Sequence, residues 1–417
     1  MLTTLHPHQE HGLKWLLSIE PQLKSNTSSI FGGILGDEMG LGKTIQTIAL
    51  IENSHLKLTV IFAPASLTRM WLNQIYKFSN LIEPYILSDE SGLVEFLHNR
   101  DKSKKTVIIC SYGLSFRRKI LQQLPFDRIV CDEAHYFRNP KSKTYKFLSS
   151  LQSKSRILLT GTPIQNKVLD IVTLINFIMK TNIKLPLDFI KLFIKKRMLA
   201  RTLDSVGITL PKMEQLDSKY HSTVENQRVI DTVKDFELNP LVKILRQKQS
   251  CVFPDSLNRC DLNSDDQINS KDNSRSDLLI DHIRNSRPKC LVFTEFRHEQ
   301  KYIHEQLKDH FRIGVINGSI PLEERAEICD DLSLDIIIIQ IQTGCVGLNL
   351  QHFSTIYFSN RQWNPTIILQ AIGRIKRIGQ KNEMKVFHFT FEGSIEERIN
   401  YIANKKLKII DDLLKSE

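Results

Sequence analysis

Short apolar runs alternate with helical patterns over two stretches of the chain, from about residue 30 to 180 and again after residue 288. In the first stretch we expect strands at residues 58–62, 106–110, 127–131 and 156–159. In the second stretch we expect strands at residues 290–293, 335–339, 355–358 and 384–387. Strands that alternate with helices are typical of a parallel sheet covered by helices on both faces. The pattern therefore predicts an α/β fold with two lobes.

A helical insertion is predicted between the two lobes. Residues 181–254 have a mostly helical and basic pattern, whereas residues 255–277 are rich in Ser, Asn and Asp and contain no aromatic residue. After residue 401, Ile and Leu recur at helical spacing. We therefore expect a first lobe over 1–180, a helical protrusion and polar linker over 181–277, a second lobe over 278–400 and a C-terminal packing helix over 401–417.

The charge balance favours a polyanionic partner. The chain has 57 Lys and Arg against 46 Asp and Glu, a formal net charge of +11. Nucleic acid is the first candidate for such a partner. On charge alone, a basic enzyme with no polyanionic partner is equally open.

Cysteine usage and the N-terminus indicate a soluble, intracellular protein. The 7 cysteines are scattered and never spaced C-x-x-C, which argues against a disulfide framework and against a zinc module. The first residues lack the basic start and apolar run of a signal peptide, and no stretch is apolar for long enough to span a membrane. We expect reduced core thiols and no membrane partner.

A glycine-rich segment, Gly36–Thr44, follows the apolar run 30–35 and precedes a helical pattern. This is the strand–loop–helix context of a phosphate loop, or Walker A motif. Glycines let backbone N–H groups turn toward phosphates, Lys43 adds a positive charge, and the Thr44 hydroxyl can hold Mg²⁺. The pattern G-x-x-x-x-G-K-T is broken at its first position, where Asp37 stands.

Two carboxylates end a later apolar run, in the sequence D-E-A-H at residues 132–135. A carboxylate at a strand tip can hold Mg²⁺ through water, and a second one can polarise an attacking water molecule. Asp132 and Glu133 fit these two roles. The alternative, a surface turn with solvated acids, is the weaker interpretation behind a strand and downstream of a phosphate loop.

Two arginines in the second lobe are spaced three residues apart, Arg374 and Arg377. If the segment is helical, both share one face and can reach the same phosphate. Arginine suits this task because its guanidinium group stays charged and can stabilise transition-state oxygens. In isolation the segment would more often be an exposed basic helix; beside the other two motifs it is interpreted as an arginine finger.

These motifs and five others occur in a fixed order that resembles the Swi/Snf family of helicase-like ATPases. The other five are Leu5–Gln9, Ala63–Leu67 with Trp71, Leu159–Asn166, Gly344–Leu350 and Trp363–Pro365. The resemblance covers nearly the whole chain, and it accounts for Asp37, because that family itself carries Asp at this position of the loop. The compactness of the chain is also similar to that of copies carried by large DNA viruses, such as the baculovirus global transactivator.

The resemblance implies two RecA-like lobes that close on ATP and Mg²⁺ and move along double-stranded DNA. It assigns Gln9 to the adenine, and Thr160 and Thr162 to coupling hydrolysis to lobe movement. It assigns Lys43 and Thr44 to phosphate and magnesium, Asp132 and Glu133 to magnesium and water, and Arg374 and Arg377 to the fingers. The remaining nucleotide-binding candidates are Asp37, Glu38, Met39, Gly40, Leu41, Gly42, Gly347 and Gln370.

DNA contact is expected mostly through phosphates, with little sequence specificity. Small residues after strands let backbone N–H groups approach an anion. The DNA-binding candidates are Pro64, Ser66, Ser111, Tyr112, Gly344 and Trp363. A plain turn after a strand is an equally open explanation for any one of these loops.

The sequence departs from the family pattern at few positions. Cys345 replaces the second glycine of a usual pair, Lys376 stands where His is frequent, and Ser359 and Asn360 stand where an acid is usual. None of these changes removes a catalytic group, so we expect an active enzyme with altered coupling. The chain has the length of a motor without a reader domain, and the lack of a Cys/His cluster excludes a RING insertion.

The leading hypothesis is a DNA-stimulated ATPase that translocates on duplex DNA and shifts DNA-bound proteins such as histones or transcription and repair factors. The resemblance also implies a nuclear location, in the host nucleus if the chain is viral. Two alternatives stay open: a helicase that separates strands of DNA or RNA, and a non-catalytic nucleic-acid-binding scaffold. The G-L-N-L, W-N-P and R-I-G-Q motifs favour the duplex translocase.

Overall fold

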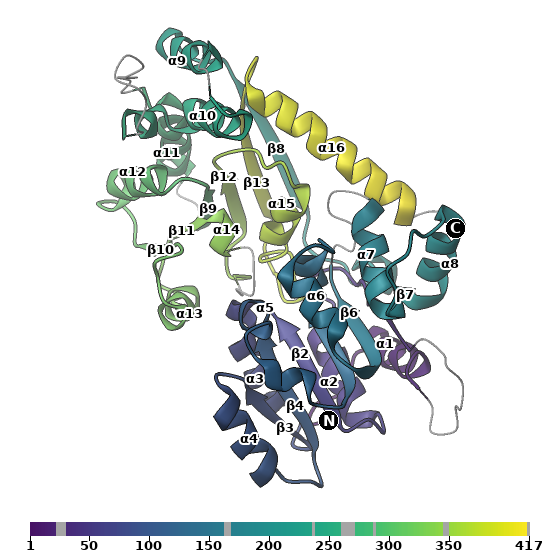
Figure 1. The fold of residues 1–417 in the computed structure, drawn as a ribbon. Coiled ribbons are helices and arrows are strands. Elements are labelled where there is room, and N and C mark those ends of the chain that lie inside the picture. Colours follow the sequence, from purple (N-terminus) through teal and green to yellow (C-terminus); the bar gives the residue numbers. More distant parts are fainter. Residues whose placement is uncertain are drawn as a thin grey trace. The chain divides into compact units, whose positions relative to one another are not determined.

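The computed structural model describes residues 1–21, 31–161, 168–235, 238–259, 272–286, 289–344 and 350–414. The chain divides into two compact units. The first unit comprises Met1–Thr209 together with Ile410–Glu417, and the second comprises Leu210–Ile409. Figure 1 traces the elements of both units along the chain.

The first unit contains a parallel sheet of seven strands in the order β3-β4-β2-β5-β6-β1-β7. Its strands are β1 (Gly32–Leu35), β2 (Leu58–Ala63), β3 (Ile82–Ile86), β4 (Lys105–Ser111), β5 (Phe126–Asp132), β6 (Ser153–Leu159) and β7 (Met198–Leu199). Its helices are α1 (Pro7–Ser18), α2 (Lys43–Asn53), α3 (Ala65–Phe78), α4 (Glu90–Asn99), α5 (Tyr112–Ser115), α6 (Lys143–Ser150), α7 (Val168–Met179) and α8 (Leu187–Arg197).

The second unit contains a parallel sheet of six strands in the order β10-β11-β9-β12-β13-β8. Its strands are β8 (Met213–Tyr220), β9 (Cys290–Thr294), β10 (Ile313–Ile316), β11 (Ile336–Gln340), β12 (Thr355–Phe358) and β13 (Met384–Phe391). Its helices are α9 (Val224–Asp235), α10 (Pro240–Val252), α11 (Ser274–Ser286), α12 (Arg297–Leu307), α13 (Leu322–Asp330), α14 (Ile341–Gly344), α15 (Pro365–Ile372) and α16 (Ile395–Leu414).

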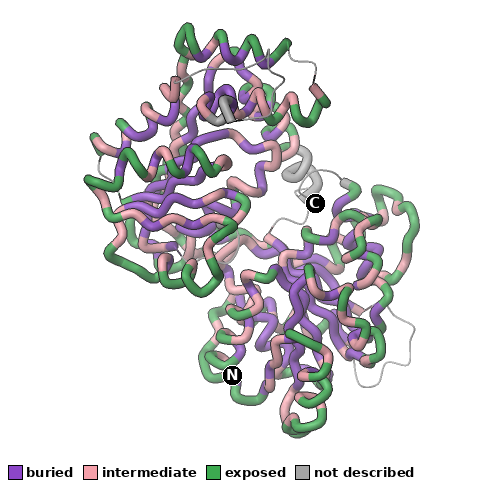
Figure 2. The backbone as a smooth tube through the Cα atoms, turned by 60° about the vertical axis from the view of Figure 1, so that its left-hand side comes forward, coloured by how far each residue is buried: buried purple, intermediate pink, exposed green. Residues whose placement is uncertain are grey.

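Each sheet is buried on both faces, as the continuous apolar runs predict. In β9, Leu291 and Phe293 belong to one apolar cluster, while Cys290 and Val292 belong to another. Since successive side chains of a strand point to opposite faces, the two clusters are the two layers that cover this sheet. Figure 2 shows the central strands of both units as buried and the outer helices as partly exposed. The predicted α/β class with two lobes is confirmed.

All eight strands predicted by residue range are present, within a few residues of the expected ends. The prediction that 181–254 is mostly helical is wrong over β8. This strand pairs with β13 at an edge of the second sheet, and its residues M-E-Q-L-D-S-K-Y are mostly polar, so they lack the apolar signal of a central strand. Residues 181–209 lie with the first unit, where β7 pairs with β1, although the predicted first lobe ended at residue 180.

The five described cysteines are free and buried, as predicted. Cys260 and Cys345 lie outside the described residues. Among the described helices, none is long and apolar enough to cross a membrane.

Candidate functional site

Three neighbouring strands of the first unit bring the predicted phosphate loop and the D-E-A-H carboxylates to one edge of the sheet. β6 lies between β1 and β5, and all three are parallel. Their carboxyl ends therefore meet at the same edge, where ligands of open α/β sheets bind. Gly36 follows β1, Asp132 ends β5, and Thr160 follows β6. The buried Thr160 is tied to β1, because its backbone N–H donates to the carbonyl of Leu35 at 3.1 Å.

The loop between β1 and α2 turns on two glycines with left-handed backbone conformations. Gly40 has φ of 96° and Gly42 has φ of 80°. Gly42 is the N-cap of α2, which begins at Lys43 and has no acidic residue in its first turn. Free N–H groups and the positive end of the dipole at such a helix start favour an anion. The described loop therefore fits phosphate by its chemistry.

The Lys43 side chain folds back onto the loop that precedes it. Its ammonium donates to the carbonyl oxygen of Asp37 at 2.6 Å. A Cβ atom at Gly161 would lie 3.6 Å from the Lys43 Nζ and 3.1 Å from Met39. Burial raises the pKa of Asp132, and the positive charge of Lys43 opposes this rise, so the two side chains act on each other electrostatically. Thr44 follows in the first turn of α2 and is partly exposed.

Asp132 is a buried carboxylate held on both oxygens. The indole N–H of the fully buried Trp71 donates to its Oδ2 at 2.8 Å, and the Glu133 backbone N–H donates to its Oδ1 at 2.9 Å. Burial raises the pKa of Asp132, and the Glu133 charge raises it further. Trp71 was part of a recognised motif, but its link to Asp132 is a finding of the structure.

Glu133 adopts a left-handed backbone conformation, with φ of 50° and ψ of 52°. Such strain in a residue with a side chain is typical of functional sites. The Glu133 Oε2 lies 3.3 Å from the Nδ1 of His135. Burial lowers the pKa of His135 to about 3, so this histidine is neutral at pH 7. A neutral imidazole at this distance contributes no positive charge to the neighbourhood of Glu133.

Gln9 links α1 to the phosphate loop. Its amide donates to the carbonyl of Leu41 at 3.4 Å and accepts from the backbone N–H of His6 at 3.1 Å. The residue is buried, and a Cβ atom at Gly42 would lie 2.6 Å from its Nε2. Gln9 therefore contacts the loop itself, in addition to the adenine-reading role that the resemblance assigns to it as a prediction.

The Asp37 carboxylate is fully buried and bound by two side chains that the sequence did not single out. Arg201 forms an ion pair with it, and Gln46 donates to its Oδ2 at 3.1 Å. Arg201 lies 164 residues further along the chain. No local spacing relates residues so far apart, which is why pattern analysis missed this contact.

The predicted DNA-binding residues of the first unit lie on the same carboxyl edge. Pro64 and Ser66 stand at the start of α3, and Ser111 ends β4. Tyr112 is buried, and its hydroxyl donates to the carbonyl oxygen of Asp132 at 2.7 Å. Its ring stacks on that of Tyr136 at 5.6 Å between centroids. The Tyr112 side chain thus supports the end of β5, so a DNA contact there would involve its backbone.

In the second unit, Arg374 and Arg377 do not share a helical face. Helix α15 ends at Ile372, and Gly373 is its C-cap, so both arginines lie in the turns that follow. The condition for a shared helical face is therefore not met, because the segment beyond Gly373 continues as a series of turns. Arg374 is buried with Gln370, whereas the Arg377 Nε donates to the Gly373 carbonyl at 2.8 Å.

Other predicted residues are placed only in part. Gly344 is the last residue of α14, and the Trp363 carbonyl accepts a hydrogen bond from Lys406 at 2.8 Å. Thr162, Cys345 and Gly347 lie outside the described residues.

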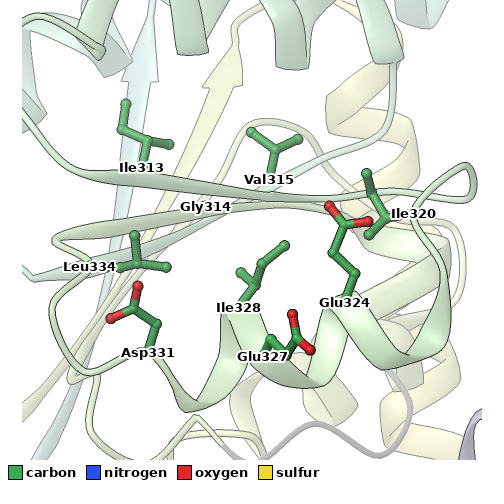
Figure 3. A pocket seen from close by; sticks show the side chains of 9 residues that line it. All are labelled: Ile313, Gly314, Val315, Ile320, Glu324, Glu327, Ile328, Asp331 and Leu334. Carbon is green, nitrogen blue, oxygen red and sulfur yellow. The ribbon is translucent and has the colours of Figure 1, made fainter.

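A separate pocket of about 420 Å³ lies over β10 and α13 (Figure 3). Its lining includes the apolar side chains of Ile320, Ile328 and Leu334 and the carboxylates of Glu324, Glu327 and Asp331. Acidic side chains repel phosphate. This pocket is therefore unsuited to a nucleotide or to the DNA backbone.

In the described part of the chain, no group of three or more His, Cys, Asp or Glu side chains is arranged to hold a metal ion. The predicted magnesium site needs only two protein ligands, Asp132 and the Thr44 hydroxyl. Mg²⁺ typically keeps several waters and takes one or two protein ligands beside substrate phosphates. The residues present thus fit the chemistry of a magnesium–nucleotide site.

Comparison with known proteins gives two family matches. The SNF2-related domain matches residues 8–250, and the helicase conserved C-terminal domain matches residues 274–379. Together these matches extend over both units.

Several curated proteins are similar to the chain over almost its full length. An uncharacterised ATP-dependent helicase of Mycoplasma genitalium is 26% identical over 99% of this chain and 42% of its own length. The ATPase of an ISWI chromatin-remodelling complex of Saccharomyces cerevisiae is 25% identical over 97% of this chain and 40% of its own length. The chain thus spans about two-fifths of these relatives.

Among solved structures, the chain is similar to the SWI2/SNF2 ATPase core of Sulfolobus solfataricus in complex with double-stranded DNA. The identity is 24%, the TM-score is 0.45, and the match covers 100% of this chain and 94% of that one.

Proposed function

The chain belongs to the SNF2-related family, and from this membership we propose that it hydrolyses ATP to ADP and phosphate on duplex DNA and uses this cycle to translocate. The observation that carries the proposal is the common position of the glycine-rich loop with Lys43 and of the carboxylate Asp132, both at the carboxyl edge of the first sheet. A cation for phosphate and a carboxylate for Mg²⁺ are the two charges that phosphoryl transfer requires.

We assign the steps as follows. Lys43 and the first-turn N–H groups of α2 would bind the phosphates, while Thr44 and Asp132 would hold Mg²⁺. Bound Mg²⁺ would neutralise charge on the phosphates. Glu133 would orient and polarise the attacking water, because it is the carboxylate next to Asp132 at the carboxyl end of β5. We propose that Arg374 and Arg377 stabilise negative charge in the transition state. Gly347 and Gln370 would lie close to the nucleotide.

Duplex DNA is the proposed track. The net charge of +11 suits phosphate contacts, and two relatives are named as helicase and chromatin-remodelling ATPase. We propose that the displaced partners are DNA-bound proteins such as histones or transcription and repair factors, and that the protein acts in the nucleus where the cell has one.

ATP hydrolysis by the purified protein tests the proposal. Turnover is measured without nucleic acid and with duplex DNA, single-stranded DNA or RNA, and Glu133→Gln serves as the blank for contaminating ATPase. Selective stimulation by duplex DNA is the expected result. Turnover that duplex DNA leaves unchanged would contradict the proposal, and unwinding of a tailed duplex would favour the strand-separating helicase. Lack of magnesium-dependent turnover above the blank would favour the non-catalytic scaffold.

A further inference from the structure

A single guanidinium group, that of Arg201, binds three parts of the candidate site. Its Nε and Nη2 donate to the two oxygens of Asp37 at 2.9 and 2.5 Å, a bidentate pair. The Nη2 also donates to the Gln46 Oε1 at 3.0 Å, and the Nη1 donates to the carbonyl of His8 at 2.5 Å. Arg201 thus connects the phosphate loop, helix α2 and helix α1.

The backbone around Arg201 runs along the same loop. We call residues 198–203 the strap. The strap begins as β7, where Met198 and Leu199 pair with Ile34 and Leu35 of β1. The pairing then continues beyond the strands, since the Gly36 N–H donates to the Leu199 carbonyl at 2.7 Å and the Glu38 N–H donates to the Arg201 carbonyl at 2.8 Å. The strap therefore supports the phosphate loop along its first residues.

The Glu38 side chain of the loop binds back to the strap. The Glu38 Oε2 accepts from the Leu203 N–H at 2.8 Å. Helix α1 approaches so closely that a Cβ atom at Gly12 would lie 1.8 Å from the Gln46 Oε1 and 3.0 Å from the Arg201 Nη2. Only glycine fits at this crossing, so the hydrogen-bonded network and the packing of α1 depend on each other.

The conformation of the phosphate loop depends on the ion pair between Asp37 and Arg201. Because this carboxylate is fully buried, removal of Arg201 would leave a charge without compensation in the loop. The backbone carbonyl of the same residue accepts the hydrogen bond from Lys43. A shift of Asp37 would therefore move the acceptor that orients the phosphate-binding ammonium.

We propose that Arg201 is a positioning residue of the nucleotide site, which holds the phosphate loop in its binding shape from the strap. The inference rests on the proposed function for its effect on nucleotide, but its effect on the loop is independent of that function. Arg201 holds Asp37 in place, and the Asp37 carbonyl in turn orients the Lys43 ammonium.

The test compares Arg201→Gln with Arg197→Gln. Arg197 lies at the end of α8, is also partly buried, and makes one hydrogen bond to the Ile19 carbonyl at 3.4 Å, away from the loop. We expect Arg201→Gln to raise the KM for ATP at least about tenfold with a smaller change in kcat, because the loop binds phosphate in both the ground state and the transition state. Arg197→Gln should leave both parameters unchanged.

Two further variants separate positioning from general destabilisation. Arg201→Lys keeps the charge but cannot form the bidentate pair, so it should recover part of the affinity. Asp37→Asn combined with Arg201→Gln removes the uncompensated charge, and its loss should be smaller than the two single losses multiplied together. The proposal would be overturned if Arg201→Lys lost as much affinity for ATP as Arg201→Gln and the double variant lost the full product of the two single losses.

Amide hydrogen exchange without nucleotide gives a readout that does not depend on ATP turnover. Arg201→Gln should speed exchange at residues 36–44 and 198–203 and leave the central strands β2 and β5 as in the parent protein. Equal acceleration across the whole first unit, or no change in the loop, would overturn the proposal. If the parent protein has no ATPase activity, the proposed function fails while this exchange experiment still decides the role of Arg201.

Discussion

Lys43 interacts with other residues of the candidate site. It contacts the Asp37 carbonyl and acts electrostatically on the buried Asp132. We predict that Lys43→Ala lowers kcat/KM for ATP at least about 100-fold, a magnitude typical of losing one group that stabilises transition-state charge. The loss has a second cause, since the pKa of Asp132 would rise further without the Lys43 charge.

Steady-state ATP hydrolysis with saturating Mg²⁺ and duplex DNA measures this effect. Lys154→Ala is the control, because Lys154 is largely exposed and pairs with Asp127 at 2.7 Å on the other end of the sheet. Its rate should stay within about twofold of the parent rate, as expected for an exposed ion pair. A Lys43→Ala protein with parent-like turnover would exclude the assigned role.

A second residue-scale prediction concerns Glu299 in the second unit. Burial raises the pKa of this glutamate on α12 to about 8, and a nearby hydroxyl, Ser359 Oγ, donates to its Oε2 at 3.2 Å. Between the ordinary value of 4.5 and about 8, the unfolded chain is ionised while the folded protein keeps the proton. The folded state therefore loses stability as pH rises through this window, by at most about 1.4 kcal/mol per pH unit.

Glu299→Gln removes this pH dependence while it keeps the shape of the side chain. We expect the variant to gain stability relative to the parent as pH rises from about 5 to 8, by about 1 kcal/mol or more. Thermal unfolding midpoints at several pH values measure the difference. Glu305→Gln on the same helix is the control. The pKa of this exposed acid is lowered by Lys308, so the stability difference between this variant and the parent should not change over that pH range. A flat difference for Glu299→Gln as well would contradict the prediction.

The part of the site that could be predicted from the sequence is the part that lies within local motifs. Lys43, Thr44, Asp132 and Glu133 follow strands in recognisable order, so their chemistry is visible in the sequence. Arg201 could not be found in this way, because its partner Asp37 is distant in the chain and no periodicity relates the two. A contact of this kind depends on which strands become neighbours, here β7 and β1.

At the scale of elements, the turn from the phosphate loop into α2 depends on Gly42. Its left-handed φ of 80° is strained for any residue with a side chain, and a Cβ atom would meet the buried Gln9 amide at 2.6 Å. We predict that Gly42→Ala costs about 1 kcal/mol for the backbone conformation alone. Displacement of Gln9 should in addition weaken nucleotide binding at least about tenfold, because α1 and the loop would no longer be held in their relative positions.

Gly207→Ala isolates the second effect. Gly207 has a similar φ of 73°, but a Cβ atom there would have open space around it. Both variants should lose comparable stability in thermal unfolding, and only Gly42→Ala should lose affinity for a fluorescent ADP analogue in titrations. Equal affinities of the two variants would show that the contact with Gln9 is without consequence.

The elements that the sequence predicted are the central strands, and those that it missed lie at or near the sheet edges. β9 and β11 are buried on both faces, so their apolar runs are continuous. β3 and β10 are edge strands: β3 (I-E-P-Y-I) is interrupted by Glu and Pro, and β10 (I-G-V-I) is an apolar run of only four residues. Edge strands are stabilised by pairing on one side only and tolerate polar residues, which removes the signal.

The departure from the family pattern after β12 has a structural counterpart in the second unit. Asn360 and Gln362 both donate amide hydrogen bonds to Glu295, which follows β9, and Lys248 pairs with the same carboxylate. An acid at position 360 would face this carboxylate and repel it. Glu295 thus supplies a negative charge close to the place where the resemblance led us to expect one.

At the scale of the whole molecule, the predicted DNA-binding residues follow the carboxyl ends of strands in each unit. In the first unit, Pro64 follows β2 and Ser111 ends β4. In the second unit, Gly344 ends the short helix after β11, and Trp363 follows β12. Pro64 has no backbone N–H, but the N–H groups of the residues around these strand ends can approach phosphates without reading bases.

This placement, with the net charge of +11, predicts that duplex binding is dominated by counterion release. Affinity should fall at least about 100-fold between about 50 and 200 mM salt, because several phosphates are neutralised together. Two duplexes of equal length and different sequence should bind within about threefold of each other, since a single good base contact would already discriminate by about 1–3 kcal/mol. Fluorescence anisotropy across a salt series measures both quantities. A preference above about tenfold that persists at high salt would indicate direct base readout and contradict the assignment of these loops to the backbone.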